Sequence, residues 1–380
     1  MIEYQLYIKM SRLKIAIDSG PLNGGHSVRG IGTHTRELIS SLRNVDAFDF
    51  QFNRSKLYAN NYDVVHFTSF HPFFLSLPLK KLKAKVVLTI HDLIPLIYPK
   101  NYPSGIKGKV RMLIQKVLLK NVGSIITISE TSKKDICRFL KVKPEKVKVI
   151  YLAPREIFKP IKDNIKLSKV KEKYSLPDTF VLYVGDINYN KNIPNLVKAC
   201  KFANVPLVIC GKQAFDIETL GVDDLSNLKG PRDWIRYLFG KPHPELAHYQ
   251  KLCREFKENK KVLRLGYLSD EELVTIYSLA SVYCQPSFYE GFGLPVLEAF
   301  ACGTPVVASK TQALVEIAEE GALFANPNSF KEIAVQITKI IKDGKVKEQL
   351  IKEGFSIAEK FSWEKAAKET LSVYEKIHKS

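Results

Sequence analysis

Several features that mark other classes of protein are missing from this sequence of 380 residues. Its six cysteines are scattered without a C-x-x-C spacing, so they suggest neither a disulfide framework nor a zinc site and indicate a reducing compartment. The first residues, MIEYQLYIKMSRLK, lack the apolar core of a signal peptide. No apolar run approaches the roughly 20 residues that a membrane-spanning helix requires. We therefore expect a folded protein of the cytoplasm.

Acidic residues are scarce in the first part of the chain. Residues 1–165 carry 28 Lys and Arg against 12 Asp and Glu, whereas residues 166–380 carry 30 against 27, and the net charge is +19. A basic surface attracts nucleic acid, anionic lipid head groups or phosphorylated substrates, and charge alone does not choose among them. Because the sequence has no RNA- or DNA-binding motif, we expect no nucleic-acid partner.

Short β-branched runs bounded by turn residues predict the strands of the first half. They are KIAIDSG (14–20), DVVHFTS (63–69), KVVLTIHD (85–92), SIITIS (124–129) and KVKVIYLA (146–153). Helical patterns such as THTRELISSLRN and TSKKDICRFLK lie between these runs. The alternation predicts a doubly wound parallel sheet that helices cover on both faces.

The same alternation starts again after a polar, lysine-rich segment at residues 155–178. The second series of predicted strands is FVLYVGD (180–186), PLVICGK (206–212), KVLRLGYL (261–268), SVYCQPS (281–287), TPVVASK (304–310) and GALFAN (321–326). The sequence therefore predicts an α/β protein with two Rossmann-like domains that face a central cleft, where ligands bind beyond the carboxyl ends of the strands. The long connection at 214–260 is expected to be a surface excursion with its own helices, and an acceptor or partner element is the alternative.

The stretch SFYEGFGLPVLEAFACGTPVVAS (287–309) carries the signals of a short helix after a strand. Pro295 suits the first helical position, and Gly303, followed by Pro305, suits the left-handed residue after the last turn. These signals predict a helix at about Pro295–Cys302.

Two glycines and two glutamates surround the start of this helix. Gly291 and Gly293 lie in the entering loop, where backbone N–H groups and the positive end of the helix dipole form an anion site. Glu290 and Glu298 are too far out of phase on a helix to form an acid/base pair, so we expect them to contact different parts of one ligand. A capped helix with two surface glutamates is the alternative.

The same stretch resembles the E-x7-E region of retaining glycosyltransferases of family 4, which adopt the two-domain GT-B fold. The other motifs that resemble this family are VRGIGTHTREL (28–38), VVLTIHDLIPLIYP (86–99), ITISETSKKDI (126–136), VIYLAP (149–154), LYVGDINYNKNIPNLVKA (182–199), GYLSDEELVTIYSLASVYCQPS (266–287) and FSWEKAAKETLSVYEKI (361–377). The resemblance implies an acceptor domain at 1–165, a nucleotide-sugar donor domain at 166–360 and a C-terminal helix at 361–380 that crosses back to the first domain.

The family transfers a sugar from a nucleotide-diphosphate donor with retention of configuration, and it uses no metal or other cofactor. The resemblance implies catalytic roles for His91 and Glu290 at the transferred sugar and for Lys191 at the donor phosphates. It places Glu298 at the ribose. The full set of implied donor-binding residues is Gly30, Gly32, Arg29, Lys191, Gly291, Phe292, Gly293, Leu294 and Glu298.

Two positions depart from the family pattern. Asp186 stands where the common V-G-R pattern has an arginine, so half of the cationic clamp on the diphosphate is missing from its usual place. Arg29 is the candidate replacement. Glu316 matches another glutamate of the family, but the glycines that usually precede it are replaced at residues 311–313.

The expected function is retaining, metal-independent transfer of a hexose to a glycan or lipid-linked acceptor. The motifs R-G-I-G, H-D-L-I-P-L-x-Y-P and V-G-D-I-x-x-x-K-N look most like mannosyltransferase members, which favours GDP-mannose as the donor and leaves UDP-sugars open. A sugar-nucleotide epimerase or a phosphorylase on the GT-B scaffold is the alternative. A dehydrogenase is not expected, because no G-x-G-x-x-G follows the first strand.

The segment GIKGKVRMLIQKVLLKN (105–121) sets Val110, Leu113, Ile114 and Val117 at helical spacing among basic residues. In one interpretation, the helix packs on the sheet and leaves a basic face in water. In the other, it docks on an anionic membrane at the inner face, where a lipid-linked acceptor is found.

Overall fold

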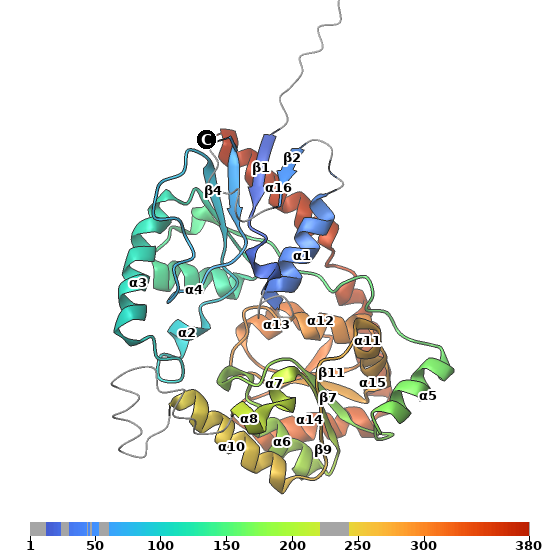
Figure 1. Ribbon diagram of the computed structural model, residues 1–380. Helices are drawn as coiled ribbons and strands as arrows, with labels where there is room; N and C mark the ends of the chain where they lie inside the picture. Colours follow the sequence, from blue (N-terminus) through green and yellow to red (C-terminus); the bar gives the residue numbers. More distant parts are fainter. Residues whose placement is uncertain are drawn as a thin grey trace, which may run out of the picture.

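The computed structural model describes residues 13–23, 30–43, 45, 48–52, 61–220 and 243–379 of the chain. These residues form two lobes, each built around a six-stranded parallel sheet, and the lobes lie one above the other in Figure 1. This arrangement confirms the predicted GT-B architecture of two Rossmann-like halves.

The first sheet has the strand order β2-β1-β3-β4-β5-β6, and every pairing in it is parallel. Its strands are β1 (Leu13–Ile17), β2 (Phe48–Gln51), β3 (Val64–Phe67), β4 (Lys85–Thr89), β5 (Ser124–Thr127) and β6 (Val147–Val149). Ile15 and Ile17 pack into one hydrophobic core, and Ala16 between them packs into another. Because side chains alternate along a strand, the sheet is buried on both faces.

The second sheet has the order β12-β11-β10-β7-β8-β9 and is also parallel throughout. Its strands are β7 (Val181–Val184), β8 (Leu207–Cys210), β9 (Val262–Leu265), β10 (Val282–Gln285), β11 (Val306–Ser309) and β12 (Ala322–Ala325). The central strand β10 is completely covered, since the burial pattern of Val282–Gln285 is uniform.

Helices cover both sheets (Figure 1). Those that begin before the second sheet are α1 (Gly30–Leu42), α2 (Ile94–Ile97), α3 (Gly105–Leu118), α4 (Glu130–Leu140) and α5 (Asn164–Lys173). Those that follow are α6 (Ile193–Ala203), α7 (Lys212–Phe215), α8 (Ile217–Leu220), α10 (Pro244–Glu258), α11 (Asp270–Leu279), α12 (Leu294–Ala301), α13 (Gln312–Ala318), α14 (Phe330–Lys342), α15 (Gly344–Ala358) and α16 (Trp363–Lys379). Within the described part of the chain, no helix is both long and apolar enough to cross a membrane.

Local capping signals set several helix ends. The Ser129 hydroxyl accepts a hydrogen bond from the backbone N–H of Ser132 at 2.9 Å and so caps α4. Ser269 and Glu272 form a reciprocal capping box on α11. Such caps satisfy backbone groups that a helix terminus leaves without partners inside the helix.

The last helix, α16, lies against the first lobe, where it contacts α1, β4 and β5 (Figure 1). The hydroxyl of Tyr374 lies 2.6 Å from Nδ1 of His66 on β3. A side chain at Gly123 would meet Ile377 of α16 at 2.2 Å, so the helix packs directly on the strand ends. The boundaries at residues 165 and 360 stay a prediction.

The sequence patterns missed two elements. β2 is short and lies at the sheet edge, where FDFQ alternates and only one neighbouring strand pairs with it. The lysine-rich segment 155–178, interpreted as a linker, contains α5, which Asp163 caps and which packs on α11.

Helices were also expected in the connection 214–260. α8 and α10 lie within it, while Trp234 falls outside the described residues.

Candidate active site

Glu290 is a densely hydrogen-bonded carboxylate at the boundary between the lobes. Its side chain is 8% exposed, and the ammonium of Lys191 donates to both of its oxygens at 2.8 Å. Oε1 also accepts from Gln285 Nε2 at 2.8 Å and from the Ser287 hydroxyl at 2.5 Å. The Tyr283 hydroxyl donates a hydrogen bond to Oε1 of Gln285 and so fixes the Gln285 amide. Burial with these partners holds the Glu290 side chain in one position.

Lys191 comes from a short 3-10 helix, Tyr189–Lys191, that follows β7. Its side chain is 23% exposed, so the ammonium that pairs with Glu290 also reaches solvent. The neighbouring Asn190 accepts a hydrogen bond from the hydroxyl of Tyr102 at 2.7 Å. Since Tyr102 belongs to the first lobe, this bond joins the two lobes beside Lys191.

Gly291 is the point where the second lobe comes closest to His91 and Asp92. A Cβ at Gly291 would lie 2.9 Å from Cβ of Asp92 and 3.2 Å from the carbonyl oxygen of His91. The carbonyl oxygen of Gly291 accepts from the hydroxyls of Ser129 at 2.6 Å and Ser132 at 3.1 Å. Any side chain at this glycine would push the lobes apart.

Gly293 is needed for a different reason. Its φ is +125°, in the region that favours glycine, and a Cβ there would lie 2.8 Å from Leu314. α12 begins at the next residue, Leu294, one residue earlier than predicted, and Gly303 after it has the expected positive φ of +74°. The first N–H groups of α12 therefore follow the loop from Glu290 to Gly293, where the sequence predicts an anion site. Phe292, between the two glycines, is buried.

Glu298 lies inside the protein on α12. The hydroxyl of Tyr277 donates to its Oε2 at 3.1 Å. Burial raises the pKa of Glu298 from 4.5 to about 7, against the opposing effect of the nearby Arg155 guanidinium. Arg155 itself makes a two-pronged ion pair with Asp270 at 2.5 and 2.8 Å. Glu290 and Glu298 therefore have different hydrogen-bond partners. Both are buried, so neither is the surface glutamate of the alternative interpretation.

His91 follows β4 and is buried at the lobe boundary. Its Nε2 lies 3.1 Å from Nδ1 of His34 on α1, and the two rings meet edge to face with centroids 4.7 Å apart. Burial lowers the pKa of His34 to about 3, so this ring is neutral. The sequence analysis did not single out His34, although it lies four residues after Gly30 in the R-G-I-G motif region.

Gly30 and Gly32 of the R-G-I-G motif belong to α1. Gly30 is the first residue of α1, and Gly32 is buried in its first turn. A Cβ at Gly30 would meet no atom within 4 Å. Arg29, the candidate second cation, falls outside the described residues.

The two positions that depart from the family pattern have defined environments. The carbonyl oxygen of Asp186 accepts from the hydroxyl of Tyr183 at 2.6 Å. Glu316 lies on α13, and its carboxylate accepts from Glu130 N at 2.7 Å, Thr131 N at 3.2 Å, Thr131 Oγ1 at 3.0 Å and the Tyr151 hydroxyl at 3.1 Å. Glu316 therefore caps α4 of the other lobe. No sequence signal near Glu316 or Glu130 predicts this contact.

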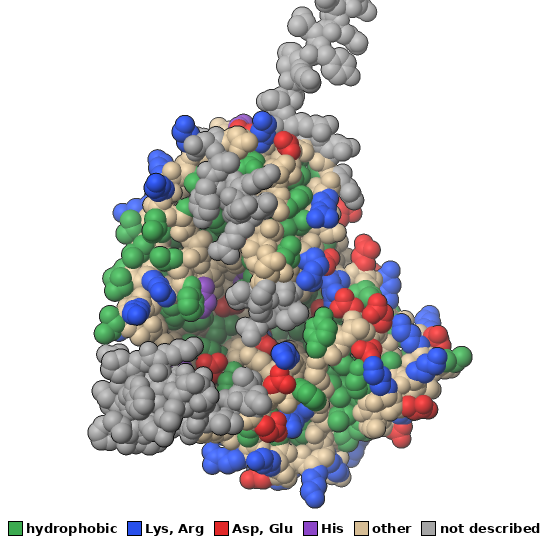
Figure 2. Space-filling model, in the orientation of Figure 1, with side chains coloured by type: hydrophobic (Ala, Val, Ile, Leu, Met, Phe, Trp, Pro, Cys, Tyr) green, Lys and Arg blue, Asp and Glu red, His purple; other side chains and the backbone are tan. Residues whose placement is uncertain are grey.

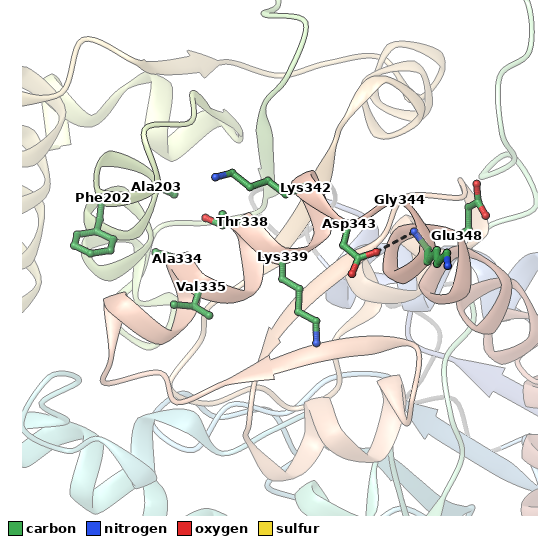
Figure 3. Close-up of a pocket in the computed structure, with 11 residues that line it drawn as sticks. Phe202, Ala203, Ala334, Val335, Thr338, Lys339, Lys342, Asp343, Gly344 and Glu348 are labelled. Carbon is green, nitrogen blue, oxygen red and sulfur yellow. Dashed lines mark hydrogen bonds between the residues drawn. The ribbon is translucent and has the colours of Figure 1, made fainter.

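A surface hollow of the second lobe contains none of the predicted site residues. It is lined by residues of α6, α14 and α15, and Figure 3 shows Phe202, Thr338 and Lys342 around it. The Asp343 carboxylate accepts from the Lys345 N–H at 3.1 Å, which caps α15. No group of three or more His, Cys, Asp or Glu that could hold a metal ion occurs among the residues that the structure describes.

The Lys191–Glu290 pair lies beside the N-terminus of α12 at the boundary between the two lobes. The family model "Glycosyl transferases group 1" matches residues 164–356, and the model "Glycosyltransferase Family 4" matches residues 28–153. Because the first model alone covers half of the chain, the protein belongs to the group 1 glycosyltransferases. It is a glycosyltransferase, as predicted.

Two curated relatives are mannosyltransferases from Escherichia coli. The chain is 29% identical to the O-antigen chain mannosyltransferase B over 76% of its own length and 70% of that protein. It is 28% identical to the serotype-specific mannosyltransferase WbdA over 80% of its length, which spans about a third of that longer protein (36%). The solved sucrose-phosphate synthase from Thermosynechococcus elongatus superposes with a TM-score of 0.69 at 22% identity, over 96% of this chain and 99% of that one.

Proposed function

We propose that this glycosyltransferase is a retaining mannosyltransferase that uses GDP-mannose and acts on a glycan or lipid-linked acceptor. The observation that carries the proposal is the Lys191–Glu290 pair, which lies next to Gly291 and the start of α12, where the second lobe packs against the backbone of His91. Mannose is favoured because the two curated relatives named above are mannosyltransferases.

In this proposal, the enzyme stabilises the negative charge of the departing diphosphate without a metal or another cofactor. The ammonium of Lys191 and the first N–H groups of α12 are positive groups that can stabilise the departing diphosphate. Lys191 would exchange its bond with Glu290 for the donor phosphates, and Glu290 would then accept hydrogen bonds from the sugar hydroxyls. Glu298 would accept from the ribose hydroxyls.

The proposed reaction proceeds on one face of the sugar. The acceptor hydroxyl forms a bond to the anomeric carbon while the bond from that carbon to the phosphate oxygen breaks. The diphosphate leaves with the electron pair, and its freed oxygen takes the proton of the hydroxyl. This step needs no carboxylate nucleophile, because the acceptor hydroxyl bonds directly to the anomeric carbon.

The activity also suggests where the enzyme works. A nucleotide sugar and a lipid-linked glycan meet at the cytoplasmic face of a membrane, which fits the scattered, free cysteines of the chain.

Donor and product analysis tests the proposal. The protein is incubated with GDP-mannose, UDP-glucose or UDP-N-acetylglucosamine, each with a panel of soluble and lipid-linked mannosides, and products are identified by mass spectrometry and by the proton NMR of the new anomeric centre. We expect GDP release and an α-linked mannose from GDP-mannose. Transfer from a UDP-sugar alone would reject the donor, and a β-linked product would reject retention.

The same incubations separate the rival activities. Formation of an epimeric nucleotide sugar without acceptor would indicate an epimerase, and dependence on inorganic phosphate would indicate a phosphorylase. Either result would replace sugar transfer as the function of this site. A repeat in the presence of EDTA tests metal independence, since a metal-dependent enzyme would lose activity.

A further inference from the structure

The helix α3 turns its apolar face to solvent and not to the sheet. Val110 is 50% exposed, Leu113 64% and Val117 61%, and Ile106 one turn earlier is 68% exposed. The residues that face the protein are instead Gly108, Met112, Gln115 and Leu118. The interpretation that the apolar residues pack on the sheet is therefore wrong. A stripe of large side chains that runs the length of a helix in water is a feature that marks an interaction surface.

A second segment extends this stripe. Phe74, Leu75 and Leu79 are 60%, 45% and 68% exposed. Their segment is fixed to α3 by the buried side chain of Gln115, which accepts from Ser76 N at 2.9 Å and donates to the carbonyl oxygens of residues 71 and 72 at 2.7 and 3.1 Å. The two pieces thus form one supported apolar surface, which we call the α3 surface. Figure 2 shows hydrophobic side chains gathered over α3 with Lys and Arg among them.

Basic residues border the α3 surface on both sides. At roughly 100° per residue, Lys107 and Arg111 lie on one side of the stripe, and Lys109 and Lys116 lie on the other. The guanidinium of Arg111 lies 5.8 Å from the centre of the Phe74 ring. Over residues 64–129 the sequence contains ten Lys and Arg and one acidic residue, Asp92, which lies at Gly291 and not on this surface.

We propose that the α3 surface binds an anionic lipid bilayer. The apolar side chains would enter the boundary between head groups and acyl chains, while the flanking Lys and Arg contact anionic head groups, as in other helices that lie in a membrane interface. A second copy of the chain is a poorer occupant, because a two-fold contact would bring two strongly basic borders together. Charge complementarity therefore selects a negatively charged partner with a broad apolar layer.

The position of the α3 surface fits the proposed acceptor, on which this inference partly rests. α3 begins three residues after Tyr102, whose hydroxyl donates to Asn190 beside Lys191. A bilayer on α3 would therefore lie near the first-lobe side of the active site, where a lipid-linked glycan could enter. Binding to the bilayer does not itself require sugar transfer, so the two properties are measured separately.

Vesicle co-sedimentation tests the inference with the full-length protein. The vesicles contain phosphatidylcholine alone or phosphatidylcholine with about a third of phosphatidylglycerol, which supplies the negative surface charge. We expect binding to the anionic vesicles to exceed binding to the neutral ones by about tenfold or more. Lys107→Gln with Lys109→Gln should weaken anionic binding roughly 25-fold, because each basic residue near the surface contributes about a factor of five.

Matched variants distinguish insertion from nonspecific charge attraction. Leu113→Ser with Val117→Ser removes apolar area and should reduce anionic binding at least about tenfold. The control is Ile165→Ser with Val335→Ser, which alters equally exposed apolar residues of α5 and α14. Lys331→Gln with Lys339→Gln on α14 controls for the loss of charge. All variants are checked by circular dichroism and by transfer to a soluble acceptor.

The outcomes separate the possible occupants. Retained vesicle binding by Leu113→Ser/Val117→Ser, or equal binding of the native protein to both vesicle types, overturns the inference. A change of oligomeric state in this variant without loss of vesicle binding would assign the surface to a second copy. If anionic binding is specific but no sugar transfer is detected in any assay, the lipid surface stands and the proposed function fails.

Discussion

The two lobes present different electrostatic surfaces to the boundary between them. The second lobe contributes charged groups in tight hydrogen-bonded arrangements, with Lys191 on Glu290 and the start of α12 next to them. The first lobe contributes neutral imidazoles, since burial lowers the pKa of both His34 and His66 to about 3. Among the described residues, Lys191 and the start of α12 in the second lobe are therefore the positive groups proposed for a leaving diphosphate.

Removing the charge of Lys191 takes away the cation that distinguishes the second lobe at the boundary, and it should have the largest effect on sugar transfer. Lys191→Met keeps the length of the side chain and removes its charge, so the diphosphate loses a stabilising cation and Glu290 loses its partner. We expect kcat/KM to fall about 10³-fold or more, because removing one preorganised group at a developing charge costs that order of magnitude. Steady-state kinetics with the identified donor measures the effect.

The control for this variant is Lys198→Met. Lys198 also forms an ion pair, with Glu255 at 3.3 Å, but it is more exposed and belongs to α6. Transfer should be nearly unchanged in this control. Near-normal transfer by Lys191→Met, with an unaltered circular dichroism spectrum, would falsify the role of Lys191.

Glu298 is a second carboxylate of the second lobe, and it differs from Glu290 because its burial disfavours the charged form. Burial raises its pKa to about 7, so the folded protein binds a proton that the unfolded chain releases between about pH 4.5 and 7. The stabilisation that proton binding at Glu298 gives the folded protein is complete below pH 4.5, the pKa in the unfolded chain. It is lost as the pH rises through about 7, the pKa in the folded protein. Glu298→Gln should raise the free energy of unfolding at pH 8 by up to about 3 kcal/mol, and the gain should vanish near pH 4.5.

The same substitution should weaken the donor. An amide accepts only at its oxygen, so one of the two acceptors proposed for the ribose hydroxyls is lost, and we expect the donor KM to rise about tenfold. Urea unfolding at pH 5 and pH 8 and donor titration measure the two effects, with Glu359→Gln at the exposed end of α15 as the control. Equal destabilisation at both pH values would show that Glu298 is charged and structural.

Sequence patterns predicted the buried strands and α12 better than the edge strand β2 and the helix α5, for a physical reason. Strands buried on both faces have short β-branched runs, and the two glycines and the proline at α12 are local backbone requirements that one stretch of sequence displays. The edge strand β2 lacks such a run. The exposed face of α3 was ambiguous because helical periodicity identifies an apolar face without indicating what covers it.

The contacts between the lobes could not be read from the sequence at all. Ser129 with Gly291 joins residues 162 positions apart across the two lobes, so this pairing depends on how the two sheets are placed. His34 with His91 joins residues 57 positions apart within the first lobe, and this pairing depends on how α1 packs beside β4. The resemblance to a family named one partner of each pair. The second partner is visible only in three dimensions.

The smallest expected effect concerns a contact that joins the lobes away from the charged pair. Glu316 of α13 accepts from two backbone N–H groups at the start of α4, where a negative charge is favoured by about 0.3–2 kcal/mol. Glu316→Gln should therefore shift the lobes modestly toward separation, because Ser129 still donates to Gly291 and Tyr289 still donates to Asp135. Small-angle X-ray scattering without donor should give a slightly larger radius of gyration, and saturating GDP should restore the native value.

Glu319→Gln is the matched control for this variant, because Glu319 follows the same helix but pairs with Lys360 of its own lobe. It should leave the radius of gyration unchanged. If both variants behave alike, the carboxylate of Glu316 acts only as a surface charge. If Glu316→Gln alone opens the protein and raises the donor KM while kcat is kept, the capping of α4 by α13 is what holds His91 against Gly291. The neutral imidazoles of the first lobe would then depend on a charge from the second lobe for their position.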